Sequence, residues 1–444
     1  MRGDPVSEIG IGLLGLGTVG SGVLKVYQQH RPALEAKAGC RLVMARVVDR
    51  DVTTPREGLS LADWSLSTDV ERVLGDPRVA VVIELFGGLE PARTFILRAM
   101  GAGKHVVTAN KALLATHGPE LFAEARRHGV LLGFEAAVAG GVPIIRALRD
   151  GLAANRILSL YGIVNGTSNF ILTKMTDEGR EFAEVLREAQ AAGYAEADPT
   201  LDVEGIDSAH KLQILASLAF RTAVELKEIH TEGISRITAE EIANARELGY
   251  RIKLLAIAKA VNGELEVRVH PTMIPAASPL SAVSGVFNAI FVSGDAVGDQ
   301  MFYGRGAGQM PTASAVWSDA IEIARRLAHG HGALPEDLPL VEPKGAGGLR
   351  VKPVDEIRSA YYLRVMALDR PGVLSQISGV LGRHDISIAS VIQKGRAHAS
   401  AVPVVMTTHE ARERDMRGAL EAIDRLPVVA GQTVMVRMET EQGA

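Results

Sequence analysis

A short stretch near the N-terminus restricts the possible folds of this chain more than any other. Residues 9–14 are apolar, Gly15-Leu-Gly-Thr-Val-Gly20 follows, and apolar residues then recur at helical spacing from Val23 to Tyr27. A strand, a Gly-x-Gly-x-x-Gly turn and a helix in that order form the dinucleotide-binding fingerprint. The stretch therefore predicts the first strand and helix of a nucleotide-binding α/β domain. A purely structural glycine turn is the less favoured interpretation.

Each glycine of this turn has a separate role. Gly15 allows the tight turn, Gly17 lets the backbone approach a pyrophosphate, and Gly20 lets the helix pack closely on the strand. The phosphates then meet the N-terminus of the helix. The second predicted strand, residues 42–48, runs into Asp49-Arg50. An acid there favours NAD and an arginine favours NADP, so the choice of cofactor stays open.

Strands and helices alternate through the rest of the N-terminal region. Strands are predicted at residues 79–85, 105–108 and 130–134, with helices at 91–100 and 119–128. This alternation predicts a doubly wound parallel sheet, in which ligands bind beyond the C-terminal ends of the strands. Lys111 and Glu135 both follow such ends. Lys111 is thus a candidate to face the cofactor, although an exposed loop lysine is an equal alternative.

Composition excludes several classes of protein. The 444 residues carry a net charge of −4 and no basic tract, so no nucleic-acid partner is expected. No apolar run is long enough to span a membrane. Cys40 is the single cysteine, which rules out a disulfide within the chain and a cysteine-based zinc site. The N-terminus lacks the apolar core of a signal peptide, so a cytoplasmic location is expected.

An acidic stretch between Gly193 and Lys211 is the main candidate for a substrate site. Five carboxylates fall within twelve positions, and an apolar helical run follows them. Asp207 and Lys211 are four residues apart, so they share one face of a helix. Carboxylates beside a lysine could hold an amino-acid ammonium next to a group that moves a proton. The alternative is a solvated acidic loop with an ordinary exposed ion pair.

Two further glycine-rich segments flank predicted elements. The first follows Glu135 and precedes a helix predicted at residues 144–152. Its free carbonyls and the Glu135 carboxylate could bind a hard monovalent cation, although a simple turn is the more economical interpretation. The second, residues 303–308, is a predicted loop before a long helix at 313–327.

The pattern changes in the C-terminal part of the chain. Residues 329–354 are rich in glycine and proline and are typical of a linker. Predicted elements then follow in the order β-α-β-β-α-β, which is ferredoxin-like. We expect them to form a separate small domain.

Taken in order, these segments resemble the homoserine dehydrogenase family, in its monofunctional type with a C-terminal ACT domain. The resemblance covers nearly the whole chain and rests on residues 15–20, 108–111, 135–144, 162–170, 193–211 and 303–308. It implies an α/β protein with three parts. They are an NAD(P)-binding Rossmann domain at 1–135, completed by about 305–330, an α+β substrate-binding, catalytic and dimerisation domain at 136–330, and an ACT domain at 355–444 after a linker at 331–354.

The resemblance also implies a reaction and its residues. The family reduces L-aspartate 4-semialdehyde to L-homoserine, reversibly, with NAD(P)H. Lys211 matches the proton donor and acceptor, and Lys111 matches a lysine at the reacting centre. The implied substrate residues are Glu196, Asp202 and Asp207; the implied cofactor contacts are Gly15, Leu16, Gly17, Thr18, Val19, Gly20, Val48, Arg50, Lys111, Gly193, Glu196 and Gly306; and the implied sodium site is Glu135 with the backbone of Val138, Gly140 and Val142.

Regulation and assembly are implied in the same way. The Asp369-Arg-Pro-Gly372 turn resembles the ligand loop of ACT modules, so we expect inhibition by L-threonine that weakens when residues 355–444 are deleted. A homodimer or homotetramer is expected. Two alternatives stay open: another amino-acid-pathway dehydrogenase of the same architecture, and a nucleotide- and amino-acid-sensing regulator without activity.

Overall fold

The N-terminal sheet has the strand order that the glycine fingerprint predicts. The computed structural model describes residues 7–331, 348–393 and 401–439. A parallel six-stranded sheet runs in the order β3-β2-β1-β4-β5-β6. Its strands are β1 (Glu8–Leu14), β2 (Arg41–Val48), β3 (Leu66–Ser67), β4 (Val79–Glu84), β5 (His105–Thr108) and β6 (Leu132–Gly133). This is the Rossmann order, and the expected fold class is confirmed.

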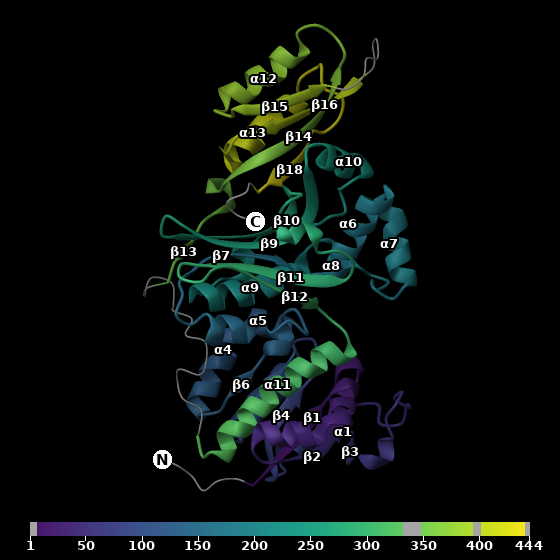
Figure 1. Ribbon diagram of the computed structural model, residues 1–444, viewed down its shortest axis with the longest axis vertical. Coiled ribbons are helices and arrows are strands. Elements are labelled where there is room, and N and C mark those ends of the chain that lie inside the picture. The colour runs from purple at the N-terminus through teal and green to yellow at the C-terminus, as the bar shows by residue number, and fades with distance from the viewer. Residues whose placement is uncertain (1–6, 332–347, 394–400, 440–444) are drawn as a thin grey trace.

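Helices cover both faces of this sheet. One face carries α1 (Thr18–Ala38) and α11 (Gln309–Ala328), and the other carries α3 (Ala92–Gly101) and α4 (Lys111–His128), with the short α2 (Glu71–Leu74) at its edge. The indole of Trp317 stacks on Tyr27, with 5.6 Å between ring centroids, and donates to the carbonyl of Val23. The chain therefore returns after residue 305 to complete the nucleotide domain, as Figure 1 shows for α11.

The second unit is an antiparallel sheet with helices on one side. Its strands run in the order β12-β11-β7-β9-β10. They are β7 (Ile157–Ile163), β9 (Tyr250–Val261), β10 (Glu264–Pro275), β11 (Phe287–Gly294) and β12 (Gly298–Arg305), with β8 (His230–Thr231) beside β10. The helices are α5 (Ile144–Arg146), α6 (Gly166–Glu178), α7 (Phe182–Ala191), α8 (Thr200–Val203), α9 (Ile206–Phe220) and α10 (Ala239–Glu247).

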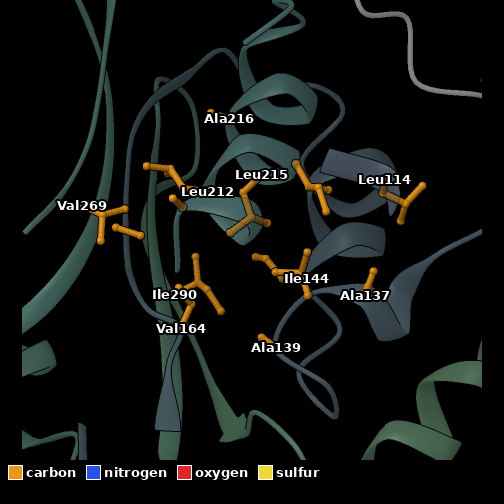
Figure 2. Close-up of a cluster of buried hydrophobic side chains, with 14 of the residues drawn as sticks. Leu114, Ala137, Ala139, Ile144, Val164, Leu212, Leu215, Ala216, Val269 and Ile290 are labelled. Atoms are coloured by element: carbon orange, nitrogen blue, oxygen red, sulfur yellow. The ribbon is translucent and has the colours of Figure 1, made fainter. Parts of the chain in front are cut away.

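The central helix of this unit is α9. Leu212 and Leu215 are fully buried on it. Figure 2 shows these side chains between Val164 and Ile290 on the sheet side and Leu114 on α4. Because α9 packs against both the sheet and the first domain, its polar residues are held at the junction of the two units.

The C-terminal unit has the predicted β-α-β-β-α-β order. Its main elements are β14 (Arg358–Leu368), α12 (Val373–Arg383), β15 (Ile388–Gln393), β16 (Ala401–Thr408), α13 (Glu413–Asp424) and β18 (Val434–Met438), with short strands β13 (Arg350–Val351) and β17 (Ala411–Arg412). This unit packs around a hydrophobic core of its own. β18 also pairs in parallel with β10 through two residue pairs, so its sheet continues into that of the second unit. Much of the predicted linker, residues 332–347, lies outside the described residues.

Several predicted boundaries were wrong for local reasons. Helix α4 begins at Lys111, not at Pro119, because the side chain of Asn110 accepts from the amide of Leu113 and caps it. The expected helix at 144–152 is helical to Gly151, but it changes from an α-helix to a π-helix after Arg146. The expected loop at 303–308 is strand as far as Arg305, since β12 pairs with β11 along its whole length. In the part of the chain described, no helix combines the length and apolar character needed to cross a membrane.

Candidate active site

The glycine turn is shaped to receive a dinucleotide phosphate. Gly15 has φ 101°, and a Cβ on Gly20 would lie 2.0 Å from the carbonyl oxygen of Gly15. A Cβ on Gly17 would meet nothing within 4 Å, so the backbone there borders open space. The first turn of α1 has neither a side-chain cap nor an acidic residue. Its amides are thus free to bind an anion, and the residues present fit a dinucleotide.

Asp49 holds the glycine turn in place through hydrogen bonds. Its carboxylate accepts hydrogen bonds from the amides of Leu16 and Asp51. Arg56 donates to the carbonyl of Leu16 from the other side, at 2.9 Å. Arg50 is exposed, and no ion pair engages it within the described ranges. The Asp49 carboxylate is thus engaged by the backbone of the loop, while the exposed guanidinium of Arg50 is available to bind a ligand.

A cleft of about 440 Å³ lies between the nucleotide domain and the second unit. Its walls come from α4, the start of α6, the acidic stretch, β11 and the segment after β12. The lining residues are Lys111, Asn165, Gly166, Thr167, Gly193, Tyr194, Asp202, Asp207, Lys211, Val286, Asn288, Arg305, Gly306, Ala307 and Gly308.

Asp207 joins two lysines at the bottom of this cleft. Its Oδ2 lies 2.7 Å from Nζ of Lys211, and its Oδ1 lies 3.1 Å from Nζ of Lys111. Burial opposes ionisation of Asp207, but the ammonium groups of Lys211 and Lys111 hold the pKa of its carboxyl well below the ordinary value. Lys211 also donates to the carbonyl of Val164 at 2.6 Å. The carboxylate of Asp207 therefore stays ionised and holds the side-chain nitrogens of the two lysines close to each other.

Asn165 connects this cluster to the acidic stretch. Its amide nitrogen donates to Asp202 at 2.7 Å and to Asp207 at 3.0 Å, while its oxygen caps α6 through the amide of Ser168. The sequence shows Asn165 in a segment rich in small polar residues, but gave no reason to assign it this role. Asn288 was missed in the same way. Its buried Oδ1 has no hydrogen-bond partner in the described structure, and its amide lies against Gly306.

Glu196 is the predicted residue that the structure does not bring into the cleft. It lies on the exposed loop between α7 and α8 and is absent from the lining. The side chain of Gln190 donates to the backbone carbonyl of Glu196, whose carboxylate has no hydrogen-bond partner among the described residues. The substrate and cofactor roles expected for Glu196 stay predictions. Gly193 and Gly306, by contrast, both line the cleft.

A buried hydrogen-bond network holds Lys111 at its position. Glu84, fully buried at the end of β4, accepts from the hydroxyl of Thr108 and from the amide of Phe86. Burial raises the pKa of Glu84. Thr108 accepts from the amide of Asn110, whose side chain donates to the carbonyl of Gly88 and caps α4. The network fixes the ends of β4 and β5 together, and therefore the start of the helix that carries Lys111.

Glu135 lies apart from this cleft. The predicted cation would bind beside its carboxylate. It is 3% exposed, and burial raises the pKa of its carboxyl. The carboxylate accepts from the amides of Ile145 and Arg146 and makes no ion pair within 4 Å among the residues described. The turn at 138–142 has positive φ at Ala139 and Gly140. A buried carboxylate with spare acceptor capacity beside an irregular backbone fits a hard cation.

A glycine turn for a dinucleotide and a lysine–aspartate–lysine cluster at the same edge of the parallel sheet belong to an NAD(P)-dependent oxidoreductase. Comparison with known proteins identifies the group within that class. Residues 143–321 match the family model "Homoserine dehydrogenase", residues 15–135 match "Homoserine dehydrogenase, NAD binding domain", and residues 361–428 match "ACT domain". The chain belongs to the homoserine dehydrogenase family.

Individual relatives agree along the whole chain. It is 44% identical over 435 residues to the homoserine dehydrogenase of Pseudomonas aeruginosa, covering 98% of this chain and 99% of the relative. The crystal structure of a homoserine dehydrogenase from Thiobacillus denitrificans is 45% identical, with a TM-score of 0.89, and covers 99% of this chain and 100% of its own. A hyperthermophilic archaeal homoserine dehydrogenase solved with NADPH is 26% identical, with a TM-score of 0.60, over 71% of this chain and 97% of its own.

Proposed function

We propose that this enzyme interconverts L-homoserine and L-aspartate 4-semialdehyde at the cleft, with Lys211 as the proton donor and acceptor. The observation that carries this proposal is the Lys111–Asp207–Lys211 cluster, in which Lys111 follows β5 at the sheet edge where the dinucleotide turn follows β1. Asp202 and Asp207 would bind the substrate ammonium, and the cofactor would contact residues 15–20, Val48, Gly193 and Gly306. Threonine, methionine and isoleucine biosynthesis in the cytoplasm is the pathway context we propose.

In the reducing direction, bound NAD(P)H supplies the hydride that reaches the aldehyde carbon. Lys211 gives its proton to the aldehyde oxygen as the new C–H bond forms, and in the reverse direction it takes the hydroxyl proton. Lys111 stabilises the negative charge that grows on that oxygen. Asp207 contacts both lysine side chains and holds them close together. Proton transfer by a positioned side chain is worth about 10²- to 10⁴-fold in rate.

The experiment is the absorbance at 340 nm of the purified enzyme with L-homoserine and either NADP or NAD. A rise with either cofactor supports the proposal. A flat trace from folded enzyme that binds the cofactor would contradict it. Parallel assays with related amino alcohols and with amino acids whose amine could be oxidised test the alternative substrate.

We also propose NADP as the preferred cofactor. Both carboxylate oxygens of Asp49 already accept from the amides of Leu16 and Asp51, which lowers their capacity to select NAD through its ribose hydroxyls. Arg50, exposed beside it, suits a 2′-phosphate. The archaeal relative solved with NADPH is in keeping with this choice.

Replacing Arg50 tests that preference. In Arg50→Ala we expect the KM for NADP to rise about tenfold because a charge-assisted contact to phosphate is lost, while the KM for NAD stays near wild type. The matched control is Arg41→Ala, since Arg41 is exposed at the opposite end of the same strand, paired with Glu8. Equal effects on the two cofactors in Arg50→Ala would contradict the assignment.

For the Glu135 site we propose a structural sodium ion, held by the carboxylate and by the backbone carbonyls of Val138, Gly140 and Val142. A cation there would compensate the buried charge of Glu135.

For assembly we propose a homodimer or homotetramer. Support comes from β12, an edge strand with Met301 and Tyr303 exposed at 42% and 53%, because exposed apolar edge strands favour pairing with another chain.

We propose that L-threonine binds the ACT domain at the turn around Asp369 and inhibits the enzyme. Asp369→Ala should raise the inhibitory concentration about tenfold, within the usual range of coupling between sites. Deleting residues 355–444 should also weaken inhibition, but it would leave Glu232 and Arg268 without their partners Arg437 and Glu439. The point variant is therefore the sharper test. Its control is Glu421→Ala on α13, and unchanged threonine inhibition in Asp369→Ala would contradict the proposal.

A further inference from the structure

A buried arginine ties the ACT domain to the second unit. Arg437 on β18 is 3% exposed and contacts two carboxylates. It donates to Glu413 of the ACT domain at 2.9 and 2.6 Å, and to Glu232 of the second unit at 2.8 and 2.9 Å. Glu232 also lies 2.7 Å from the ring of His230. Partial burial of the Glu232 side chain, which is 41% exposed, opposes its ionisation, but His230 and Arg437 hold the pKa of its carboxyl well below the usual range.

The backbone around Glu232 is fixed on its other side by the acidic stretch. The amide of Ile234 donates to the carbonyl of Val203 at 2.8 Å. Gly233 is in such close contact that a Cβ there would lie 2.3 Å from that same carbonyl oxygen and 2.5 Å from Cα of Glu204. A movement of residues 232–234 therefore displaces the backbone at 203–204.

This backbone joins the two helices that carry the site carboxylates. Asp202 immediately precedes Val203, and Asp207 lies in the first turn of α9. The same side-chain nitrogen of Asn165 donates to both carboxylates, so the distance between the two carboxylates is fixed by this shared partner. A shift at 203–204 changes that separation directly.

We propose that Glu232 is a positioning residue through which Arg437 of the ACT domain sets the placement of Asp202 and Asp207 in the active site. The inference rests on the proposed roles of these two carboxylates. Arg437 holds Glu232, the 232–234 backbone holds residues 203–204, and these hold the start of α9. Removing the ion pair loosens the substrate carboxylates and leaves the cofactor turn, which lies between β1 and α1 of the nucleotide domain, unchanged.

A second ion pair across the same domain boundary provides the matched control. Arg364 on β14 pairs with Glu241 and Glu240 on α10. Its side chain is 12% exposed and Glu241 is fully buried, so its environment resembles that of Arg437. Helix α10 contributes no residue to the lining of the cleft. Arg364→Met therefore removes a comparable contact without reaching the acidic stretch.

The experiment compares full-length Glu232→Gln, Arg437→Met and Arg364→Met. Hydrogen exchange is measured over residues 200–207, and the KM values for L-homoserine and NADP are measured separately. In the first two variants we expect faster exchange there and a KM for homoserine raised about tenfold, the equivalent of about 1.4 kcal/mol, with the KM for NADP near wild type. Arg364→Met should match the wild type in all three.

Glu232→Gln decides the question if Arg437→Met does not fold, because its side chain is 41% exposed and a neutral amide there is easily hydrated. Unchanged exchange in Glu232→Gln would overturn the inference, as would equal effects in Arg364→Met. Hydrogen exchange needs no turnover. Faster exchange in an enzyme that does not oxidise homoserine would therefore support the coupling while refuting the proposed reaction.

Discussion

Lys211→Met should fold and bind the cofactor but lose about 10²- to 10⁴-fold in kcat, the usual value of a positioned acid or base. Methionine keeps most of the volume of the lysine and removes the ammonium that donates to Asp207 and to Val164. Asp207 retains Lys111 and Asn165, so the fold keeps a partner for the buried carboxylate. The measurement is kcat for homoserine oxidation at saturating cofactor.

The control is Lys227→Met, which removes a lysine whose side chain is 78% exposed and which does not line the cleft. Its kcat should equal that of the wild type. Cofactor fluorescence checks that both variants bind NADPH. If Lys211→Met turned over at a near-normal rate, Lys211 would have no part in the proton transfer.

Asp207→Asn should lower kcat/KM by at least about 10²-fold, because the carboxylate that positions Lys211 for proton transfer is lost. Here two ammonium groups lose their shared carboxylate. The measurement is kcat/KM for homoserine oxidation at saturating cofactor.

The free energy of unfolding should decrease when the pH is lowered below the ordinary pKa of Asp207. The pKa of Asp207 is below its ordinary value of 3.8 in the folded enzyme. Its ionised form therefore stabilises the fold above that ordinary value, and the contribution is lost as the pH falls towards the lowered one. Asp207→Asn should lose less unfolding free energy on acidification than the wild type does.

Asp198→Asn is the matched control for Asp207→Asn, since Asp198 belongs to the same acidic stretch. It is exposed, accepts from Thr200 and does not line the cleft. Wild-type kinetics are expected in this variant. A comparable loss of activity in both variants would mean that the general charge of the loop matters, and not the contact of Asp207 with the lysines.

Local sequence was enough to predict the parts of the site that depend on neighbouring residues. The glycine turn follows from the steric freedom of Gly15 and from the close packing at Gly20, which no other residue allows. The Asp207–Lys211 pair follows from helical geometry, since residues four apart lie on one face. These contacts join residues that are close in the sequence, so they can be predicted without knowledge of the tertiary structure.

Other features depend on segments far apart in the chain. Lys111 reaches Asp207 only because α4 packs against α9. Asn165 joins Asp202 to Asp207 from another helix start, and Glu196, in the same acidic stretch, stays outside the cleft. No spacing in the sequence distinguishes Glu196 from Asp202, because the path of the loop decides which carboxylate turns inward.

By itself, therefore, the sequence determined the class of fold, the cofactor turn and the helical pair at the centre of the cleft. The tertiary structure alone decided that Asp49 supports the turn, that the C-terminal sheet continues into the second unit, and that Arg437 reaches Glu232. The physical reason is the same in each case. Burial and pairing of charged groups depend on which distant segments come together, and the arrangement that satisfies all of them is a property of the whole packed chain.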